Sequence, residues 1–181
     1  LLKEVGELYG LQVAVCFTNM NQPLGKTAGL WCEIMESIEC LKGNGSEDVM
    51  AVVYHLGEEA LKLAGIKNSK EQLKTAISDG SAFNTFKEMV EAHGGSLESL
   101  NDPNTYAPEY CEKVCAETDG YITSMDTLRL GMAVVHLGGG RIQQTDKLDP
   151  SVGITFYKKI GDEVSKGEPL LEYYCSGKDK L

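Results

Sequence analysis

The run Leu11–Thr18, LQVAVCFT, is the feature that most limits how this chain can fold. It is β-branched and apolar on both faces, and such a run predicts a strand inside a sheet that helices cover. A single strand cannot satisfy its own backbone groups, so this run requires partner strands. Only helical patterns accompany it in the first hundred residues. We therefore expect the partners of this strand to lie in sequence upstream of the chain.

Helical periodicity dominates the rest of the first hundred residues. Leu1, Val5 and Leu8 share one helical face, and Gly10 is placed to end that helix in a left-handed conformation. Ser46 is a good N-cap, and the acidic residues that follow it suit the positive end of a helix. Further helices are predicted at 30–41, 47–65, 69–78 and 82–93.

The chain divides at Asn101–Pro108, NDPNTYAP, where two prolines and several turn formers interrupt every periodicity. After this break the period shortens towards two, and KVCAET, GYITS, GITFYKK and PLLEYY are predicted strands. One amphipathic helix, about 126–137, lies among them and ends at three glycines. The second part is therefore predicted to be a small α+β module.

Two ordered groups of motifs resemble the thymidine and pyrimidine-nucleoside phosphorylase family. The first is TNMNQPLGKTAGLWCEIME at 18–36, which is similar to the family's MxQPLG segment. The second group, at 119–171, contains DGYITSMDT, LGGGR, VGITFYKKIGDEV and KGEPL in the family's order. The chain differs from the family at 29–33, where GLWCE replaces the common GNALE. Trp31 either fills a space that another element fills in relatives or is exposed, and both readings remain open.

The resemblance implies an α/β fold, with helices on part of a mixed sheet whose N-terminal half is missing, followed by a small α+β C-terminal module. It divides the chain into the rear part of a phosphate-binding α/β domain (1–100), a linker (101–110) and the C-terminal module (111–181). Turns at Gly161-Asp162 and Lys166-Gly167 resemble the hairpin of biotinyl and lipoyl carrier domains. Those carriers are modified on a lysine at an exposed turn. Here Asp126 stands at the nearest similar position, which disfavours a carrier function.

For activity, the resemblance implies phosphorolysis of a pyrimidine nucleoside to the free base and a pentose 1-phosphate, in nucleoside salvage. Inorganic phosphate is the co-substrate, and the intact enzyme of this family is a cytoplasmic homodimer. The family's phosphate-binding glycine loop, and the Arg, Ser and Lys that hold the base, come from segments that precede anything present here. We therefore expect a C-terminal fragment that is inactive alone, and no catalytic residue is assigned. The alternative is a non-catalytic binding or interaction module that retains the fold.

The resemblance also implies one site within this chain, for a monovalent, potassium-like cation. Its expected ligands are the carbonyl oxygens of Leu24 and Thr27 and the carboxylate of Glu36, together with oxygens of the absent phosphate loop. Oxygen is the ligand atom that hard cations prefer. The competing interpretation is that Glu36 lies on a solvated helix face and that the turn only caps the helix.

Other motifs favour structural roles. The three glycines before Arg141 follow a helix, at the negative end of its dipole, so they predict a helix stop and a chain reversal and not a phosphate cradle. Arg141 is expected to bond the last helical carbonyls or to pair with Asp146 or Asp149. Cys111 and Cys115 have no nearby histidine and make a poor zinc site. The three histidines have no partner at metal-ligand spacing.

Charge and cysteine usage restrict the partners and the compartment. The net charge of −10 repels phosphate backbones and anionic surfaces, which argues against nucleic acid as a partner. No apolar run is long enough to span a bilayer, so no membrane association is expected. The six cysteines lack the dense spacing of a secreted disulfide scaffold, which favours a reducing, cytoplasmic setting.

Overall fold

The computed structural model describes residues 1–102 and 104–177 of the 181-residue chain. The order of elements is helix-rich first and strand-rich second. The helices are α1 (Leu2–Leu8), α2 (Trp31–Leu41), α3 (Glu47–Leu63), α4 (Ser69–Ser78), α5 (Ser81–Ala92) and α6 (Thr127–Val134), with a short 3-10 helix at Ser99–Asn101 and a π-helical turn at Val135–Gly139. The strands are β1 (Thr27–Gly29), β2 (Tyr110–Cys115), β3 (Gly120–Tyr121), β4 (Gly153–Phe156), β5 (Glu163–Val164) and β6 (Pro169–Cys175).

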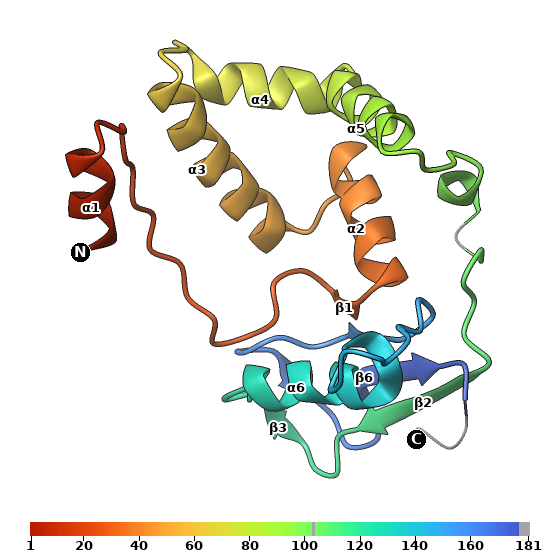
Figure 1. Cartoon of the computed structure of the whole chain (residues 1–181). Helices are drawn as coiled ribbons and strands as arrows, with labels where there is room; N and C mark the ends of the chain where they lie inside the picture. The colour runs from red at the N-terminus through yellow and green to blue at the C-terminus, as the bar shows by residue number, and fades with distance from the viewer. Residues whose placement is uncertain (103, 178–181) are drawn as a thin grey trace.

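Helices α1 to α5 and the sheets occupy different parts of the molecule, whereas α6 lies beside the strands (Figure 1). Helices α3, α4 and α5 form an arch, and α2 lies between this arch and the strands. Four of the five expected helices of the first hundred residues begin and end within about three residues of their predicted bounds, because each has an apolar stripe and a defined end. The fifth, α1, ends at Leu8, and Gly10 adopts φ 76° as predicted.

All described strand pairs are antiparallel, so the structure is an α/β arrangement of helices and antiparallel sheets in place of the expected mixed sheet. The four-stranded sheet has the order β1-β4-β6-β2, and β3 pairs with β5 in a small second sheet. Strand β1 comes from the first part of the chain, yet Thr27 faces Thr155 in the ladder. Val152, Ile154 and Cys175 are almost fully buried and form the centre of this region.

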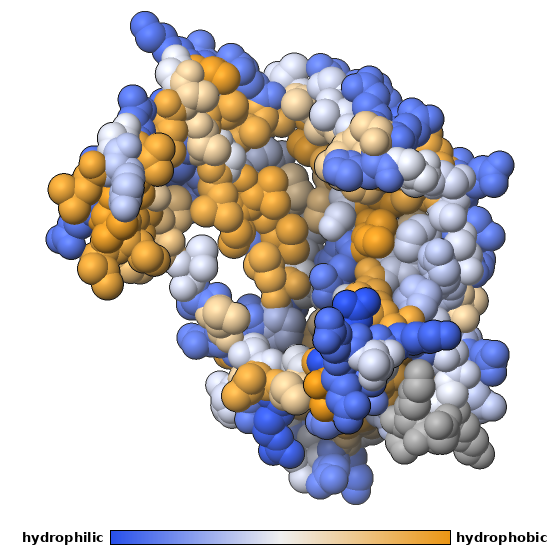
Figure 2. Space-filling model, in the orientation of Figure 1, coloured by the Kyte–Doolittle hydropathy of each residue, from blue (hydrophilic) through white to orange (hydrophobic). Residues whose placement is uncertain are grey.

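The prediction of a strand at Leu11–Thr18 was wrong for the described residues. The segment is extended, but it belongs to no strand ladder. Phe17 is 95% exposed and Val15 is 52% exposed. Figure 2 shows apolar side chains gathered over α1 and the neighbouring face of α3, beside an open hollow. A strand needs a partner for its N–H and C=O groups, and no described segment supplies one here.

The three glycines end the helical segment formed by α6 and the π-helical turn after it, as predicted. Gly138 has φ 107°, and its carbonyl accepts a hydrogen bond from the amide of Asp149, which reverses the chain. Arg141 reaches Asp146, but its Nε donates to the backbone carbonyl and not to the carboxylate, at 3.2 Å. The Asp146 carboxylate instead accepts the amides of Ile142 and Gln143. Glycine is therefore used here to stop a helix.

A turn tied to both parts of the chain

The three residues predicted as cation ligands are brought together. Leu24, Thr27 and Glu36 line one cavity of about 380 Å³, which lies between the turn, α2 and the start of α3. We call residues 20–27 the QPLG turn. It follows the unpaired extended segment and leads directly into β1.

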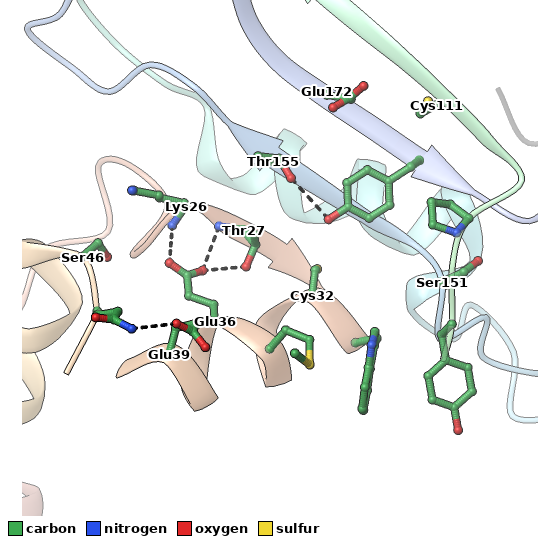
Figure 3. Close-up of a pocket in the computed structure, with 17 residues that line it drawn as sticks. Lys26, Thr27, Cys32, Glu36, Glu39, Ser46, Cys111, Ser151, Thr155 and Glu172 are labelled. Atoms are coloured by element: carbon green, nitrogen blue, oxygen red, sulfur yellow. Dashed lines mark hydrogen bonds between the residues drawn. The ribbon is translucent and has the colours of Figure 1, made fainter. Parts of the chain in front are cut away.

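Glu36 closes the turn from the α2 side (Figure 3). Its Oε1 accepts the Lys26 amide at 2.7 Å, and its Oε2 accepts the Thr27 amide at 2.9 Å and the Thr27 hydroxyl at 2.6 Å. A carboxylate that accepts amide hydrogens makes stronger hydrogen bonds than a neutral acceptor. Gly25 has φ 75°, and a Cβ at this position would lie 2.6 Å from Glu36 Oε1. The glycine is therefore required both by the backbone and by the carboxylate beside it.

The carbonyl oxygens of Leu24 and Thr27, the two predicted backbone ligands, point away from the groups that bind the adjacent backbone. The Phe156 amide donates to the Lys26 carbonyl, and the Leu30 amide donates to the Val152 carbonyl. In this register Thr27 belongs to a pair without ladder hydrogen bonds, so its carbonyl points away from β4. The amide of Gly25 donates to Asp48 Oδ2 at 3.0 Å. Because C=O and N–H point in opposite directions across a trans peptide, the Leu24 carbonyl points away from Asp48. Among the described residues, no donor reaches this carbonyl.

The oxygen atoms of Leu24, Thr27 and Glu36 are compatible with a hard cation. A carboxylate has about four acceptor sites, and the amides and hydroxyl described above use three of those on Glu36. One site therefore remains, beside two peptide carbonyls, and all are the oxygen ligands that such ions take. No group of three or more His, Cys, Asp or Glu side chains suited to a metal occurs in the described part of the chain. A cation here would thus depend on backbone oxygens.

The strand-rich part of the chain binds the opposite side of the QPLG turn. The Lys159 ammonium donates to the Pro23 carbonyl at 2.5 Å and contacts Asp48 Oδ2 at 3.3 Å. The Ile160 amide donates to the Gln22 side chain at 2.9 Å. The Thr127 hydroxyl, at the start of α6, donates to the Met20 carbonyl at 2.8 Å. Sequence reasoning missed these contacts, because nothing in the sequence indicates which distant segment lies beside the turn.

The electrostatics of Asp48 follow from these neighbours. Partial burial alone would raise the pKa of this carboxyl. The nearby Ser46 hydroxyl, the hydrogen bond from the Gly25 amide and the charge of Lys159 together outweigh burial and lower the pKa below its ordinary value. Asp48 therefore stays ionised at neutral pH, as an acceptor for Gly25 and a counter-ion for Lys159.

A larger cavity of about 680 Å³ lies between α2 and the four-stranded sheet, and Figure 3 shows its lining. Burial raises the pKa of the Cys32 thiol, so this cysteine stays protonated at neutral pH.

Trp31 settles the question left open by the sequence. It is only 9% exposed, and its ring packs edge-on against Tyr106 of the predicted linker, with centroids 5.1 Å apart. The indole thus fills space beneath the linker.

The remaining candidate groups lie elsewhere. His93 is exposed and bonds the Met89 carbonyl of its own helix. Cys111 and Cys115 are exposed on β2, and all six cysteines are free. No described helix combines the length and apolarity that crossing a bilayer requires.

Comparison with known proteins identifies the family. The model of the pyrimidine nucleoside phosphorylase C-terminal domain matches residues 121–181. A pyrimidine-nucleoside phosphorylase of Geobacillus stearothermophilus is 34% identical over 178 residues, which are 96% of this chain and 41% of the relative. A thymidine phosphorylase of Metamycoplasma hominis is 31% identical over 183 residues, which are 97% of this chain and 66% of the relative.

A third relative, a pyrimidine-nucleoside phosphorylase of Staphylococcus aureus, is 33% identical over 180 residues, which are 97% of this chain and 42% of the relative. The chain thus spans about two fifths to two thirds of the length of these curated relatives. The similarity extends over both groups of motifs and over the QPLG turn. The chain therefore belongs to the thymidine and pyrimidine-nucleoside phosphorylase family, and it contains that family's C-terminal domain.

Proposed function

We propose that this chain serves in the phosphorolysis of a pyrimidine nucleoside, with inorganic phosphate as co-substrate, as the C-terminal part of a phosphorylase. The observation that supports this most is the 34% identity over 96% of the chain to a pyrimidine-nucleoside phosphorylase. No catalytic residue is assigned within residues 1–181, because the segments that the family uses to bind substrate have no counterpart here. The chain alone is therefore inactive.

The exposed apolar segment favours this proposal over a self-sufficient binding module. A module that had lost the chemistry would need its sheet completed within 181 residues or by another protein. Instead the Leu11–Thr18 segment is unpaired in the described structure, and Phe17 is 95% exposed. Such a segment is suited to pair with strands of the phosphate-binding domain. The proposal retains the division into 1–100, 101–110 and 111–181, the biotinyl-like hairpins around Gly161 and Gly167, and a cytoplasmic homodimer for the intact enzyme.

The proposal includes a monovalent, potassium-like cation at the QPLG turn. The carbonyls of Leu24 and Thr27 and the carboxylate of Glu36 would hold it. When bound, the ion would offset the negative charge of the Glu36 carboxylate. Two features support this site. The three residues line one cavity. Glu36 retains one acceptor site that its hydrogen bonds do not use, and the carbonyls of Leu24 and Thr27 point away from the groups that bind the adjacent backbone.

A chimera tests the proposed activity. The part of the Geobacillus stearothermophilus enzyme outside its matched 178 residues is joined to this chain, and release of thymine and uracil from their nucleosides is measured with and without phosphate. We expect phosphate-dependent release by the chimera and none by the 181-residue chain. A chimera that folds as a dimer and binds phosphate, yet releases no base, would contradict the proposal and favour the non-catalytic module.

A further inference from the structure

Lys159 connects the strand-rich part of the chain to the QPLG turn, although it belongs to no predicted ligand set. It follows β4, and its own amide donates to Asp162 Oδ2 at 2.8 Å, which fixes the local backbone. Its side chain is 23% exposed. The ammonium therefore reaches the Pro23 carbonyl and the Asp48 carboxylate from an anchored position, in a partly desolvated setting.

The contacts of Lys159 fall on both sides of Leu24. On one side, the ammonium binds the carbonyl of the Pro23–Leu24 peptide directly. On the other side, it binds Asp48, whose Oδ2 accepts the amide of the Leu24–Gly25 peptide. The direction of an amide fixes the direction of the carbonyl in the same planar peptide unit. The orientation of the Leu24 carbonyl thus depends on Asp48, which Lys159 holds through Oδ2 while the Val49 amide holds Oδ1 at 2.9 Å.

Two independent groups of contacts therefore hold the predicted ligands. Glu36 binds the amides of Lys26 and Thr27, on the α2 side of the turn. Lys159 and Asp48 fix the peptides around Leu24, on the opposite side. Each contact involves an ionised partner, and such hydrogen bonds are about twice as strong as neutral ones. Loss of one group should therefore leave the other in place.

We propose that Lys159 is a positioning residue for the cation ligand at Leu24, because it holds the Pro23 carbonyl and the Asp48 carboxylate and thereby orients the Leu24 carbonyl. The inference rests on the proposed cation site. It makes the cation affinity of the first part of the chain depend on a side chain of the second part.

The test compares Lys159→Met with Lys158→Met in the 181-residue chain. Lys158 is a matched control, because its ammonium also binds one carbonyl, that of Glu163 at 3.0 Å, and one carboxylate, that of Glu168 at 2.6 Å. Amide hydrogen exchange is followed by NMR. In Lys159→Met we expect exchange of the Gly25 amide to rise about tenfold, because its acceptor Oδ2 of Asp48 loses the Lys159 ammonium, while the Thr27 amide on Glu36 changes less than about twofold. In Lys158→Met neither amide changes.

The second readout is cation binding. This readout uses the chimera described above, which supplies the phosphate loop. KCl is titrated against choline chloride at constant ionic strength, and the carbonyl ¹³C signals of Leu24 and Thr27 are followed. In the wild type we expect both signals to shift with potassium, and in Lys159→Met we expect the same shift only at several-fold higher potassium. Removal of a nearby positive charge would by itself tighten cation binding. A weaker affinity in Lys159→Met therefore reports lost orientation, and Lys159→Arg should recover part of it.

The outcomes separate the inference from the proposal on which it rests. If potassium shifts both carbonyl signals equally in the wild type and in Lys159→Met, the positioning role is refuted while the cation site stands. Equal exchange rates of the Gly25 amide in Lys159→Met and Lys158→Met would likewise refute the positioning role while the cation site stands. If potassium shifts neither signal in the wild type, the cation site itself is refuted, and the inference is refuted with it. The chimera assay does not depend on either result.

Discussion

Two adjacent segments of this chain, Leu11–Thr18 and the QPLG turn, show opposite outcomes for their backbones. The first has the composition of a buried strand, yet no described strand pairs with it and Phe17 is 95% exposed. The second has an irregular sequence, yet its amides and carbonyls bind Glu36, Asp48 and Lys159. The difference teaches that local composition does not create order where partners are absent. Distant side chains can order a turn that has no regular pattern.

The largest expected effect comes from the ladder that continues the ordered turn. A Cβ at Gly29 would lie 2.4 Å from the Val152 carbonyl oxygen and 2.7 Å from the Gly153 Cα, and both are backbone atoms. We expect Gly29→Ala to lower the free energy of unfolding by about 3 kcal/mol in urea titrations. Gly120→Ala is the control, because a Cβ there meets nothing within 4 Å. Equal effects of the two substitutions would contradict the pairing of β1 with β4.

The next effect concerns the carboxylate that closes the turn. Glu36→Ala leaves the amides of Lys26 and Thr27 without their acceptor, and we expect a loss of about 2 kcal/mol in the free energy of unfolding. Glu39→Ala is the matched control on the same helix. Its carboxylate binds only the exposed side chains of Lys42 and Asn44, so we expect a change within about 0.5 kcal/mol. A loss as large for Glu39→Ala would mean that Glu36 acts only as a surface charge.

A smaller, pH-dependent effect is expected at Tyr174 in β6. Burial, followed by its interaction with Cys32, raises the pKa of this phenol well above the ordinary value of 10.0. The stability that the neutral Tyr174 phenol contributes is therefore complete below pH 10.0. It is lost as the pH rises above 10.0, because this phenol ionises in the unfolded chain before it ionises in the folded chain.

Tyr174→Phe should accordingly flatten the alkaline loss of stability, measured as the urea midpoint between about pH 8 and pH 11. Tyr9→Phe is the control in the unpaired end of the chain, where the side chain is 82% exposed, and it should leave the profile unchanged. Identical profiles for Tyr174→Phe and the wild type would show that Tyr174 does not titrate as a buried group.

The smallest effect is expected in the unpaired segment. Phe17→Ser should change the free energy of unfolding by less than about 0.5 kcal/mol, because the ring is 95% exposed, while solubility rises. Phe156→Ser, at a position that is 4% exposed, should lose about 3 kcal/mol or more. Similar losses for both, in urea titrations, would show that Phe17 is packed in solution and would remove the contrast between the two segments.

The sequence predicted those elements whose signals are local. The apolar stripes of α2–α5 and the glycines at their ends are local features, and they gave correct helices. The strand ladder of β1 was not predictable, because only three residues take part and their partners lie at 153–155. The strand predicted at Leu11–Thr18 failed for a related reason. Its pattern was correct for a buried strand, but burial requires neighbours that a pattern cannot supply.

The candidate site divides in the same way. Leu24, Thr27 and Glu36 followed from a motif within 13 consecutive positions (24–36), and the structure gathers them around one cavity. Their role as cation ligands stays a prediction. Lys159 lay in a run expected to form a strand, 136 positions from the carbonyl that it binds, and nothing in its surroundings marked it. Long-range contacts of this kind depend on the fold, so only the three-dimensional structure reveals them.

The distance along the chain between the QPLG turn and Lys159 also sets the order of events during synthesis. The turn leaves the ribosome first, and the ammonium that binds Pro23 follows 136 residues later. Nascent domains form in the order in which their contacts become available, and contacts of long sequence separation form late. The turn is therefore completed only after residue 159 has been made. A message cut short before the codon for Lys159 would yield a product whose helices are already made and whose QPLG turn is still loose.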